Sequence, residues 1–447
     1  MDLLMAFLVF AGAMIAVLVW GAEYGMLLAL GVGAAGFYLV ARHRGFDSAD
    51  LVRMMAKGMR RSLLVVRILV LVGAMTALWR AGGTIAFFVV QGTRLIPPGM
   101  FLLAAFLLTA VMAYALGTSF GVTGTMGVIL VTLARSGGVP VAMTAGAVLS
   151  GAYFGDRTAP ASSCANLVAT VCGVPIYDHV RRCLRSAAVP MLLCTAAYAA
   201  LSLGHPLAGG GGDLTGAMEG AYVLGFWAAL PAILMLALPL FRVPVGLAML
   251  FSCGAALCAG WLVQGVPPAE LLRGAVMGYQ APQGLEGLLS GGGILSMTKV
   301  AGVVLLSGTF SGIFQGTGML SAVQTRLEAL AGRWGRYAAL FVTALGSAML
   351  FCNQTIAILM CQQLLGPVYQ REGCTAGETA LDLSDSAAVL VALCPWCVAC
   401  AVPLEMLGVG LEALPWAGFL WLLPLCRLVG ERVRLGRKKG PPVGKIC

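Results

Sequence analysis

SGAYFGDRTAPASSCANLVATVCGVPIYDHVRRCLRSAAVP, residues 150–190, is the stretch around which the chain is organised. It begins in apolar sequence and ends in a basic cluster that contains Arg181, Arg182 and Arg185. The run between them is too rich in hydrogen-bonding groups for a helix that only packs in lipid. Broken membrane helices of this kind are tolerated where they line a buried or watery cavity. The stretch therefore predicts a transport site, in which freed carbonyls and short side-chain oxygens coordinate a small cation.

Composition places the whole chain in the membrane. Of its 447 residues, 60% are hydrophobic and 10% are charged, and the mean hydropathy is +0.93. Soluble domains carry about 25% charged residues, so a soluble chain could not cover its surface with so few. We predict an all-α polytopic membrane protein. At about 20 residues per span, the apolar segments give roughly ten to twelve transmembrane helices.

The basic residues predict the topology. The net charge is +10, and two basic clusters stand out, one over residues 42–61 and one over residues 432–445. The positive-inside rule places both in the cytoplasm. Residues 3–20 and 25–41 then form a transmembrane hairpin with a cytoplasmic N-terminus. The start lacks a basic signal-peptide region, so we expect the first helix to be retained.

Four polar joints interrupt the apolar segments. The first is GTSFGVTGT at 117–125, the second lies within 155–167, the third is CNQT at 352–355, and the fourth is LSDS at 383–386. Glycine costs about 1 kcal/mol in a helix interior, so the first joint is an unwound break or a hairpin tip. Each half of the chain has the order joint, helix, second joint. Paired interruptions in two halves are the sequence signature of a carrier built from inverted repeats.

This order predicts five regions. They are an N-terminal transmembrane hairpin with the start of the basic loop (1–50), a first inverted repeat (51–204), a linker with connecting spans (205–290), a second inverted repeat (291–430) and a basic cytoplasmic tail (431–447). The glycines at 209–212 mark the linker. The repeats contain broken helices or re-entrant hairpins.

Two carboxylates are the main candidates for ion binding. Asp385 lies between Ser384 and Ser386 and is followed by apolar sequence; it could also cap a helix. Asp156 follows Gly155, and its alternative is a helix-end acid that faces headgroups and pairs with Arg157. A carboxylate in a low-dielectric site holds its proton more tightly, so a proton and a sodium ion can compete for it.

Further candidates are one cation and several neutral oxygens. Lys299 either snorkels to the membrane interface or pairs with Asp385 or Asp156 in the bundle. Hydroxyl and amide groups gather in the joints, although such groups also serve helix packing. These candidates are Thr118, Ser119, Thr123, Ser162, Ser163, Asn166, Asn353, Gln354 and Ser386. The 14 cysteines lie mostly in apolar sequence, and His43, His179 and His205 fall in expected loops, so neither residue type predicts a metal site.

The joints resemble those of the NhaC-type sodium/proton antiporter family. Where that family reads GTSWGTxGTxG, this chain reads GTSFGVTGTMG at 117–127. Where it reads GDxxSPxSDTTNL, this chain reads GDRTAPASSCANL at 155–167. The family signature LEDxxT…PLIPWN corresponds to LSDSAAVLVALCPWC at 383–397. Asp156 and Asp385 match the family acids, whereas Ser163 and Ser384 replace two others.

The resemblance implies a secondary sodium/proton antiporter of a bacterial-type inner membrane that works by alternating access. The alternative is a sodium- or proton-coupled carrier of a small carboxylate or amino acid. If sodium is transported, we expect Asp385, Ser163 and Thr118 to contribute to its site. We expect no enzymatic activity and no cofactor beyond the transported ions. Partners would be lipid and a small cation or organic substrate, with no nucleic acid, and a homodimer remains open.

Overall fold

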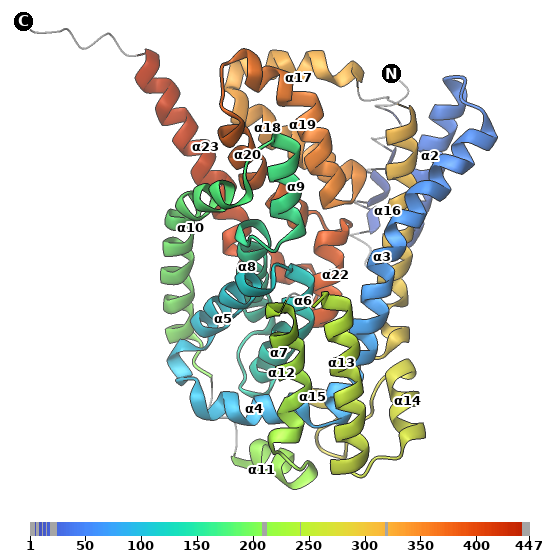
Figure 1. The fold of residues 1–447 in the computed structure, drawn as a ribbon, viewed down its shortest axis with the longest axis vertical. Helices are drawn as coiled ribbons and strands as arrows, with labels where there is room; N and C mark the ends of the chain where they lie inside the picture. The colour runs from blue at the N-terminus through green and yellow to red at the C-terminus, as the bar shows by residue number, and fades with distance from the viewer. Residues whose placement is uncertain are drawn as a thin grey trace, which may run out of the picture.

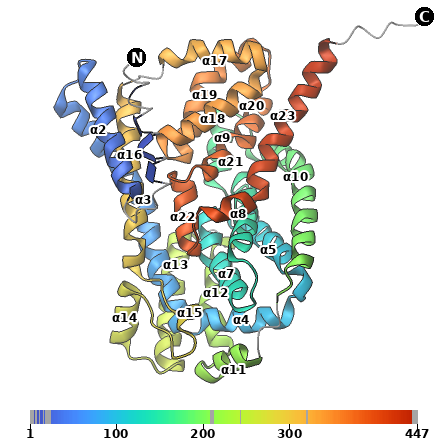
Figure 2. The ribbon, with the colours of Figure 1, turned by 180° about the vertical axis from the view of Figure 1, so that it is seen from behind.

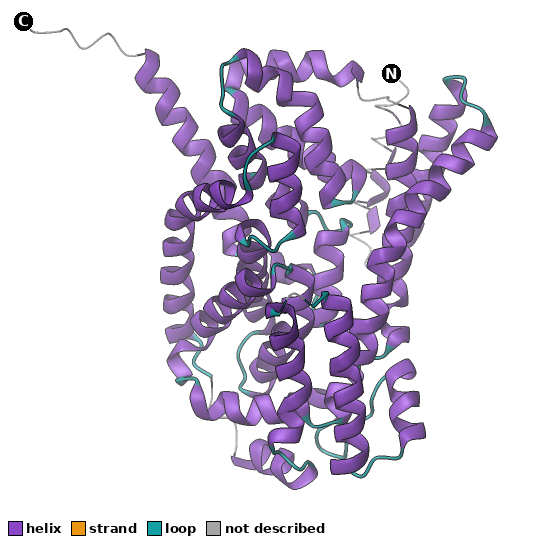
Figure 3. Cartoon of the chain, in the orientation of Figure 1, coloured by secondary structure: helices purple, strands orange, loops and turns teal. Residues whose placement is uncertain are grey.

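The chain folds as helices over the residues that the structure describes. The computed structural model describes residues 5, 9, 10, 12–14, 16, 17, 25–207, 212–241, 243–317 and 321–439. Within these ranges there is no strand, only one isolated bridge between Tyr279 and Gly291 (Figure 3). The predicted all-α class is confirmed. Most of the expected first span (3–20), residues 208–211 of the linker and the tail beyond Lys439 lie outside the described residues.

Six helical segments in the described ranges are long and apolar enough to cross a membrane, or up to eight if each of two bent pairs is one span. This confirms a polytopic membrane protein. The sequence-based figure of ten to twelve also counted shorter segments, such as Ile294–Thr309 and Arg336–Phe351. The six are Gly25–His43, Ser48–Ala81, Pro98–Leu116, Ser119–Ser136, Ile176–Gly204 and Val245–Val263.

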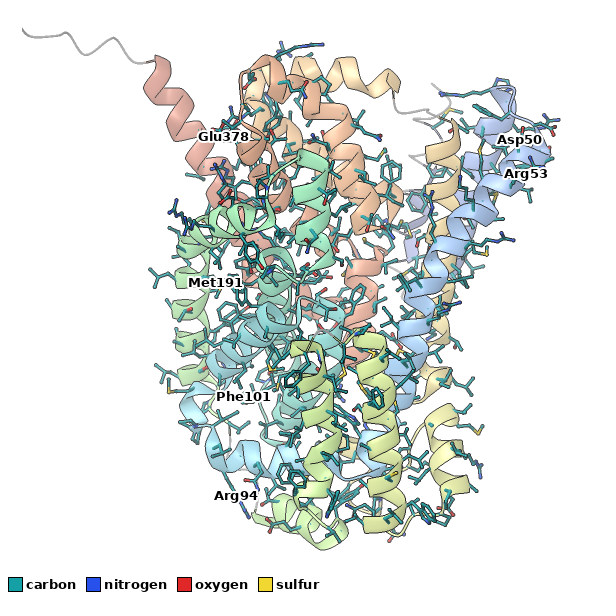
Figure 4. All side chains as sticks on the ribbon, viewed as in Figure 1. Asp50, Arg53, Arg94, Phe101, Met191 and Glu378 are labelled. Carbon is teal, nitrogen blue, oxygen red and sulfur yellow. The ribbon has the colours of Figure 1, made fainter. Side chains whose placement is uncertain are left out.

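The basic segments gather at one end of the molecule. The loop between α2 (Gly25–His43) and α3 (Ser48–Ala81), helix α17 (Ser321–Trp334) and the C-terminal end of α23 (Gly418–Lys439) all lie at the top of Figure 1. Figure 4 shows Asp50 and Arg53 at this end and Arg94 at the opposite end. The two predicted cytoplasmic clusters therefore share one side of the fold.

Helix α3 is the longest element and pairs closely with α16 (Thr298–Thr317). Its 34 residues give about 51 Å at 1.5 Å per residue, well beyond the hydrocarbon core of about 30 Å. A Cβ on Gly58 would lie 2.1 Å from the carbonyl oxygen of Gly308. The two backbones therefore touch through glycines.

The first joint is the tip of a helical hairpin. Helix α5 (Phe101–Leu116) enters it, and α6 (Ser119–Val122), the π-helical η2 (Thr123–Gly127) and α7 (Val128–Ser136) leave it. Both ends of the hairpin reach Leu207: its N–H donates to the carbonyl of Pro98 at 2.9 Å, and its side chain touches Gly137. The hairpin thus opens towards the end occupied by α4 (Thr84–Leu95), at the bottom of Figure 1.

The second joint interrupts a longer helical segment that runs through the bundle. Helix α8 (Val141–Thr158) ends there, α9 (Ser163–Cys172) continues beyond it, and α10 (Ile176–Gly204) returns towards the α4 end. Helix α8 packs along α5. Figure 2 shows α8 in the middle of the molecule.

The second half repeats this plan with the opposite sense. Helices α18 (Arg336–Phe351) and α19 (Gln354–Arg371) form a hairpin whose ends meet where Arg336 Nη1 lies 3.7 Å from Glu372 Oε2. This hairpin opens towards α17 (Figures 1 and 2). A broken path follows through α20 (Ala376–Asp385), α21 (Ala387–Leu390), η5 (Val391–Leu393) and α22 (Val398–Leu407), and η6 (Leu411–Trp416) leads into α23.

Two hairpins that enter from opposite ends are the arrangement expected of inverted repeats. The segments between the halves are α11 (Gly212–Ala221), α12 (Phe226–Leu240), α13 (Val245–Cys258) with η3 (Ala259–Val263), α14 (Pro268–Met277), α15 (Glu286–Leu289) and η4 (Ile294–Met297). The exact boundaries of the five predicted regions stay predictions.

Candidate functional site

The two hairpin tips have nearly the same backbone geometry. Gly117 is left-handed (φ 67°, ψ 30°) and Thr118 is extended (φ −149°, ψ 123°). At the other tip Cys352 is left-handed (φ 52°, ψ 17°) and Asn353 is extended (φ −142°, ψ 127°). Thr118 and Asn353 then cap the outgoing helices by accepting from the N–H of Gly121 and of Ile356, at 3.2 and 3.4 Å.

Each tip lies against a break in a spanning helix. A Cβ on Gly117 would lie 2.6 Å from the carbonyl carbon of Ala161, so only glycine fits against the α8–α9 joint. At the second tip the N–H of Val398 donates to the carbonyl of Cys352 at 3.0 Å. Gln354 of the third joint donates to the Ala388 carbonyl, next to the fourth joint, at 2.7 Å. Arg157 of the second joint pairs with Asp385 of the fourth. The structure therefore brings the four predicted joints together in the middle of the bundle.

Asp156 lies where the two hairpins meet α8. Its side chain is buried, with Ser162 Oγ 3.1 Å from Oδ1 and Gln354 Nε2 3.4 Å from Oδ2. Ser119, from the first tip, lies beside the same carboxylate. Ser162 also caps α9 by accepting from the N–H of Cys164 at 3.0 Å. Within the described ranges the hydrogen-bonding partners of the Asp156 carboxylate are neutral.

Asp385 has a different environment. It is fully buried and forms a salt bridge with Arg157, which is itself buried. Its Oδ1 accepts from Ser186 Oγ at 3.2 Å, and Nε of Arg427 lies 4.0 Å from its Oδ2. The sequence suggested an acid among hydroxyls, whereas the structure gives it two guanidinium neighbours. Ser384 and Ser386 point to other partners, His179 (3.0 Å) and the Asp382 carbonyl (2.7 Å).

Sequence reasoning missed the ionic network around α20. Asp382 is buried and contacts Nη2 of Arg427 at 2.6 Å and Tyr369 Oη at 3.0 Å. Nε of Arg336 lies 3.8 Å from Asp382. The sequence feature that could have indicated this network is Asp382, which lies three residues before Asp385 and therefore on the same face of the helix. His179, expected in a loop, lies buried in α10.

Of the remaining predicted residues, two bond to backbone carbonyls within the joints and one is exposed. Thr123 donates to the Ser119 carbonyl at 2.8 Å within the first hairpin. Asn166 donates to the carbonyls of Pro160 and Ser162, so it braces the α8–α9 joint, and Ser163 is exposed. The described partners of Asp385 include neither Ser163 nor Thr118, the other two oxygens of the expected sodium site. That set stays a prediction.

Lys299 lies beside Glu405 of α22. The two residues line one cavity of about 240 Å³, together with Met26, Pro395 and Leu404. The positive charge of Lys299 acts on the Glu405 carboxylate. The structure therefore pairs the predicted cation with an acid from α22.

Comparison with known proteins identifies relatives over almost the full length. The family model described as Na+/H+ antiporter family matches residues 3–165 and 151–429. An uncharacterized Na(+)/H(+) antiporter of Haemophilus influenzae is 27% identical over 89% of this chain and 91% of its own. The Malate-2H(+)/Na(+)-lactate antiporter of Bacillus subtilis is 28% identical over 73% and 72%. The Na(+)/H(+) antiporter NhaC of Alkalihalophilus pseudofirmus is 26% identical over 88% of each chain.

Proposed function

Because the chain belongs to the Na+/H+ antiporter family, we propose that it exchanges sodium for protons and that Asp156 binds them in turn. The resemblance of its joints to the NhaC type is confirmed by these relatives. One observation carries the role of Asp156. Its carboxylate is buried among neutral donors at the point where both hairpin tips meet α8, so a bound proton or cation supplies the balancing positive charge.

The helix ends around Asp156 suit both states of the exchange. The N-terminal ends of α9 and α19 carry partial positive charge, which stabilises a carboxylate. The C-terminal end of α5 leaves a carbonyl oxygen at Gly117, the kind of ligand that sodium takes in other broken-helix carriers, whereas the Cys352 carbonyl accepts from the N–H of Val398. Protonation of Asp156 removes the anionic ligand, so sodium and the proton compete for one group.

The Arg157–Asp385 pair is assigned a positioning role. Asp385 already has a cation at its carboxylate, and a buried pair of this kind is costly to break. It ties α8 to the break between α20 and α21. Sodium at Asp385 would lie beside two guanidiniums, since Arg157 binds Oδ1 and Nε of Arg427 lies 4.0 Å from Oδ2. The described hydrogen-bonding partners of Asp156 are neutral.

The topology in the membrane is a proposal as well. We place the protein in a bacterial-type inner membrane, with the α2–α3 loop, α17 and the end of α23 in the cytoplasm. The relative named for malate and lactate supports a second candidate function, which is the exchange of a small carboxylate by a protein of the same architecture.

The test is exchange in proteoliposomes with an imposed pH gradient. Sodium, lithium and potassium are added in turn, and a pH-sensitive dye inside reports proton movement. Sodium should dissipate the gradient with the wild type, and Asp156→Asn should reduce the signal to that of empty liposomes. Asp50→Asn, an exposed acid in α3, is the matched control and should behave as wild type. Sodium-driven proton movement that persists in Asp156→Asn overturns the assignment.

A further inference from the structure

A polar cavity at the opposite end from the basic loops combines two arginines with a glycine turn. Its volume is about 290 Å³. Arg80 comes from the end of α3, Arg135 from the end of α7, and the turn 290–292 with Ser296 closes one wall. Thr76 and Thr132 add hydroxyls, and Glu405 of α22 lines the far side. The cavity therefore lies between α7 of the first hairpin, the end of α3, η4 and α22.

Arg80 is the key residue of this cavity. Its Nε is buried and has no hydrogen-bonding partner among the described residues. Its Nη1 makes one long contact, 3.5 Å, to the Thr76 carbonyl of its own helix. A buried donor left without an acceptor is destabilising, and more so when it is charged. The cavity thus contains a positively charged hydrogen-bond donor, Arg80 Nε, that has no acceptor among the described residues.

The charge balance points in the same direction. Arg135 lines the same cavity as Arg80, so two groups of like charge share it. Among the described residues, Arg135 donates to two backbone carbonyls, those of Gly408 at 2.9 Å and Leu407 at 3.5 Å. Glu405 is the acid that lines this cavity, and it is shared with Lys299 on its other side. Two guanidiniums therefore share this cavity with one carboxylate, which leaves the cavity with an excess of positive charge.

We propose that this cavity binds a small organic carboxylate, held by the forked donors of Arg80 and Arg135. Guanidinium groups match a carboxylate with two parallel hydrogen bonds. The cavity volume exceeds what a single chloride needs and accommodates a short carbon chain. This inference rests on the proposed carrier function and adds a substrate class to it.

The location gives the carboxylate a role in the transport cycle. Arg135 follows Ser119 by sixteen positions on the hairpin limb, about 24 Å if the limb is straight. The anion therefore does not share the Asp156 site. The bound anion contacts both Arg135 at the far end of the hairpin and Arg80 of α3. Its binding and release therefore shift the position of the hairpin relative to α3 and α16.

The experiment measures binding without transport. The purified protein in lipid nanodiscs is titrated calorimetrically with sodium succinate and sodium lactate. Sodium chloride and sodium phosphate are tested at the same ionic strength. We expect saturable binding of at least one carboxylate. Arg80→Gln and Arg135→Gln should each weaken it about tenfold or more, since each removes a charged donor.

Two further variants make the result decisive. Glu405→Gln should tighten carboxylate binding, because it removes the negative charge that faces the ligand. Arg273→Gln, an exposed arginine that lines a different cavity at the same end, should leave it unchanged. Equal affinity for chloride or phosphate would overturn the carboxylate assignment. Affinities that none of the three cavity variants moves would overturn the site.

Failure here is distinguishable from failure of the exchange proposal. Asp156→Asn should bind the carboxylate with wild-type affinity although it moves no protons. If Asp156→Asn loses carboxylate binding while Arg80→Gln keeps it, the anion binds at the hairpin tips and the proposal is wrong. Thermal unfolding of each variant in nanodiscs reports whether a loss of binding comes from a loss of fold.

Discussion

Asp156 and Arg157 are consecutive in the sequence, yet they serve two separate sites. Asp156 faces Ser162 and Gln354, while Arg157 faces Asp385 and Ser186 from α20 and α10. Successive residues on a helix point about 100° apart, so α8 can present its acid to one site and its base to another. The separation leaves Asp156 without a cationic partner among the described residues and gives Asp385 one.

Removing either member of the buried Arg157–Asp385 pair should destabilise the protein strongly. Breaking such a pair leaves an uncompensated buried charge, at a cost of about 3–5 kcal/mol. Asp385→Asn and Arg157→Gln should each lower the unfolding temperature in nanodiscs, and the double variant should recover much of the loss. The exposed pair Asp50 and Arg53 is the control, with an expected effect of about 0–1 kcal/mol. Single variants that unfold at the wild-type temperature would contradict the pairing.

Gly117→Ala should disable the first hairpin tip. Gly117 and Gly138 both have positive φ, +67° and +69°, and an alanine there costs about 1–2 kcal/mol in either place. Only at Gly117 would the new Cβ also collide with the Ala161 and Ser162 backbone. Gly138→Ala has open space and should keep transport. Equal activity of the two variants in proteoliposomes would show that the tip does not pack against the α8–α9 joint during exchange.

Ser162→Ala should weaken both the cap of α9 and the ion site. Loss of a serine cap costs about 0.5–2 kcal/mol, and Asp156 loses the hydroxyl 3.1 Å from its Oδ1. We expect a higher apparent KM for sodium together with a modest fall in stability, and Ser162→Thr should restore part of both. Ser163→Ala changes an exposed neighbour and is the control. A sodium KM raised only in Ser163→Ala would instead favour the cation set expected from the sequence.

Glu431→Ala should loosen the second hairpin from outside the ion site. Glu431 of α23 accepts from the N–H of Tyr337 at 3.0 Å and of Ala338 at 3.3 Å, so it caps the start of α18. We expect a loss of about 1–2 kcal/mol, read as a lower unfolding temperature and faster hydrogen exchange at 337–340. Glu412→Ala removes an acid that bonds only its neighbour Gly410 and should change neither. Unaltered exchange in α18 would contradict the capping role.

The sequence predicted where the helices break better than it predicted what the breaks contact. The four joints were found from glycines and hydroxyls because an unwound backbone needs those residues locally. Whether a joint is a hairpin tip depends on the direction of the chain after the break. Local sequence does not encode that direction, so Gly117 and Cys352 were recognised as tips only in the structure.

Partners distant in sequence were the harder part. Asp385 lies 228 positions from Arg157, and no periodicity connects the two. Lys299 was expected either at the membrane interface or beside Asp385 or Asp156, whereas the structure places it beside Glu405, where α16 packs on α22. Ser162 was identified correctly as a polar residue of the joint, but its contact with Asp156 required the turn at 159–162 to fold back.

The glycine contact between α3 and α16 determines which part of the protein can serve as a stationary frame. Helix α3 outreaches the hydrocarbon core and carries exposed Arg53, Lys57, Arg60 and Arg61 near its start. Sliding it inward would bring those charges into lipid, at about 2.5–3.5 kcal/mol each near the bilayer centre. Helix α16 is tied to it by backbone contact and shares this anchorage. We therefore expect any vertical displacement during the cycle to occur in the two hairpins and the helices that they contact, while α3 and α16 stay fixed relative to the headgroups.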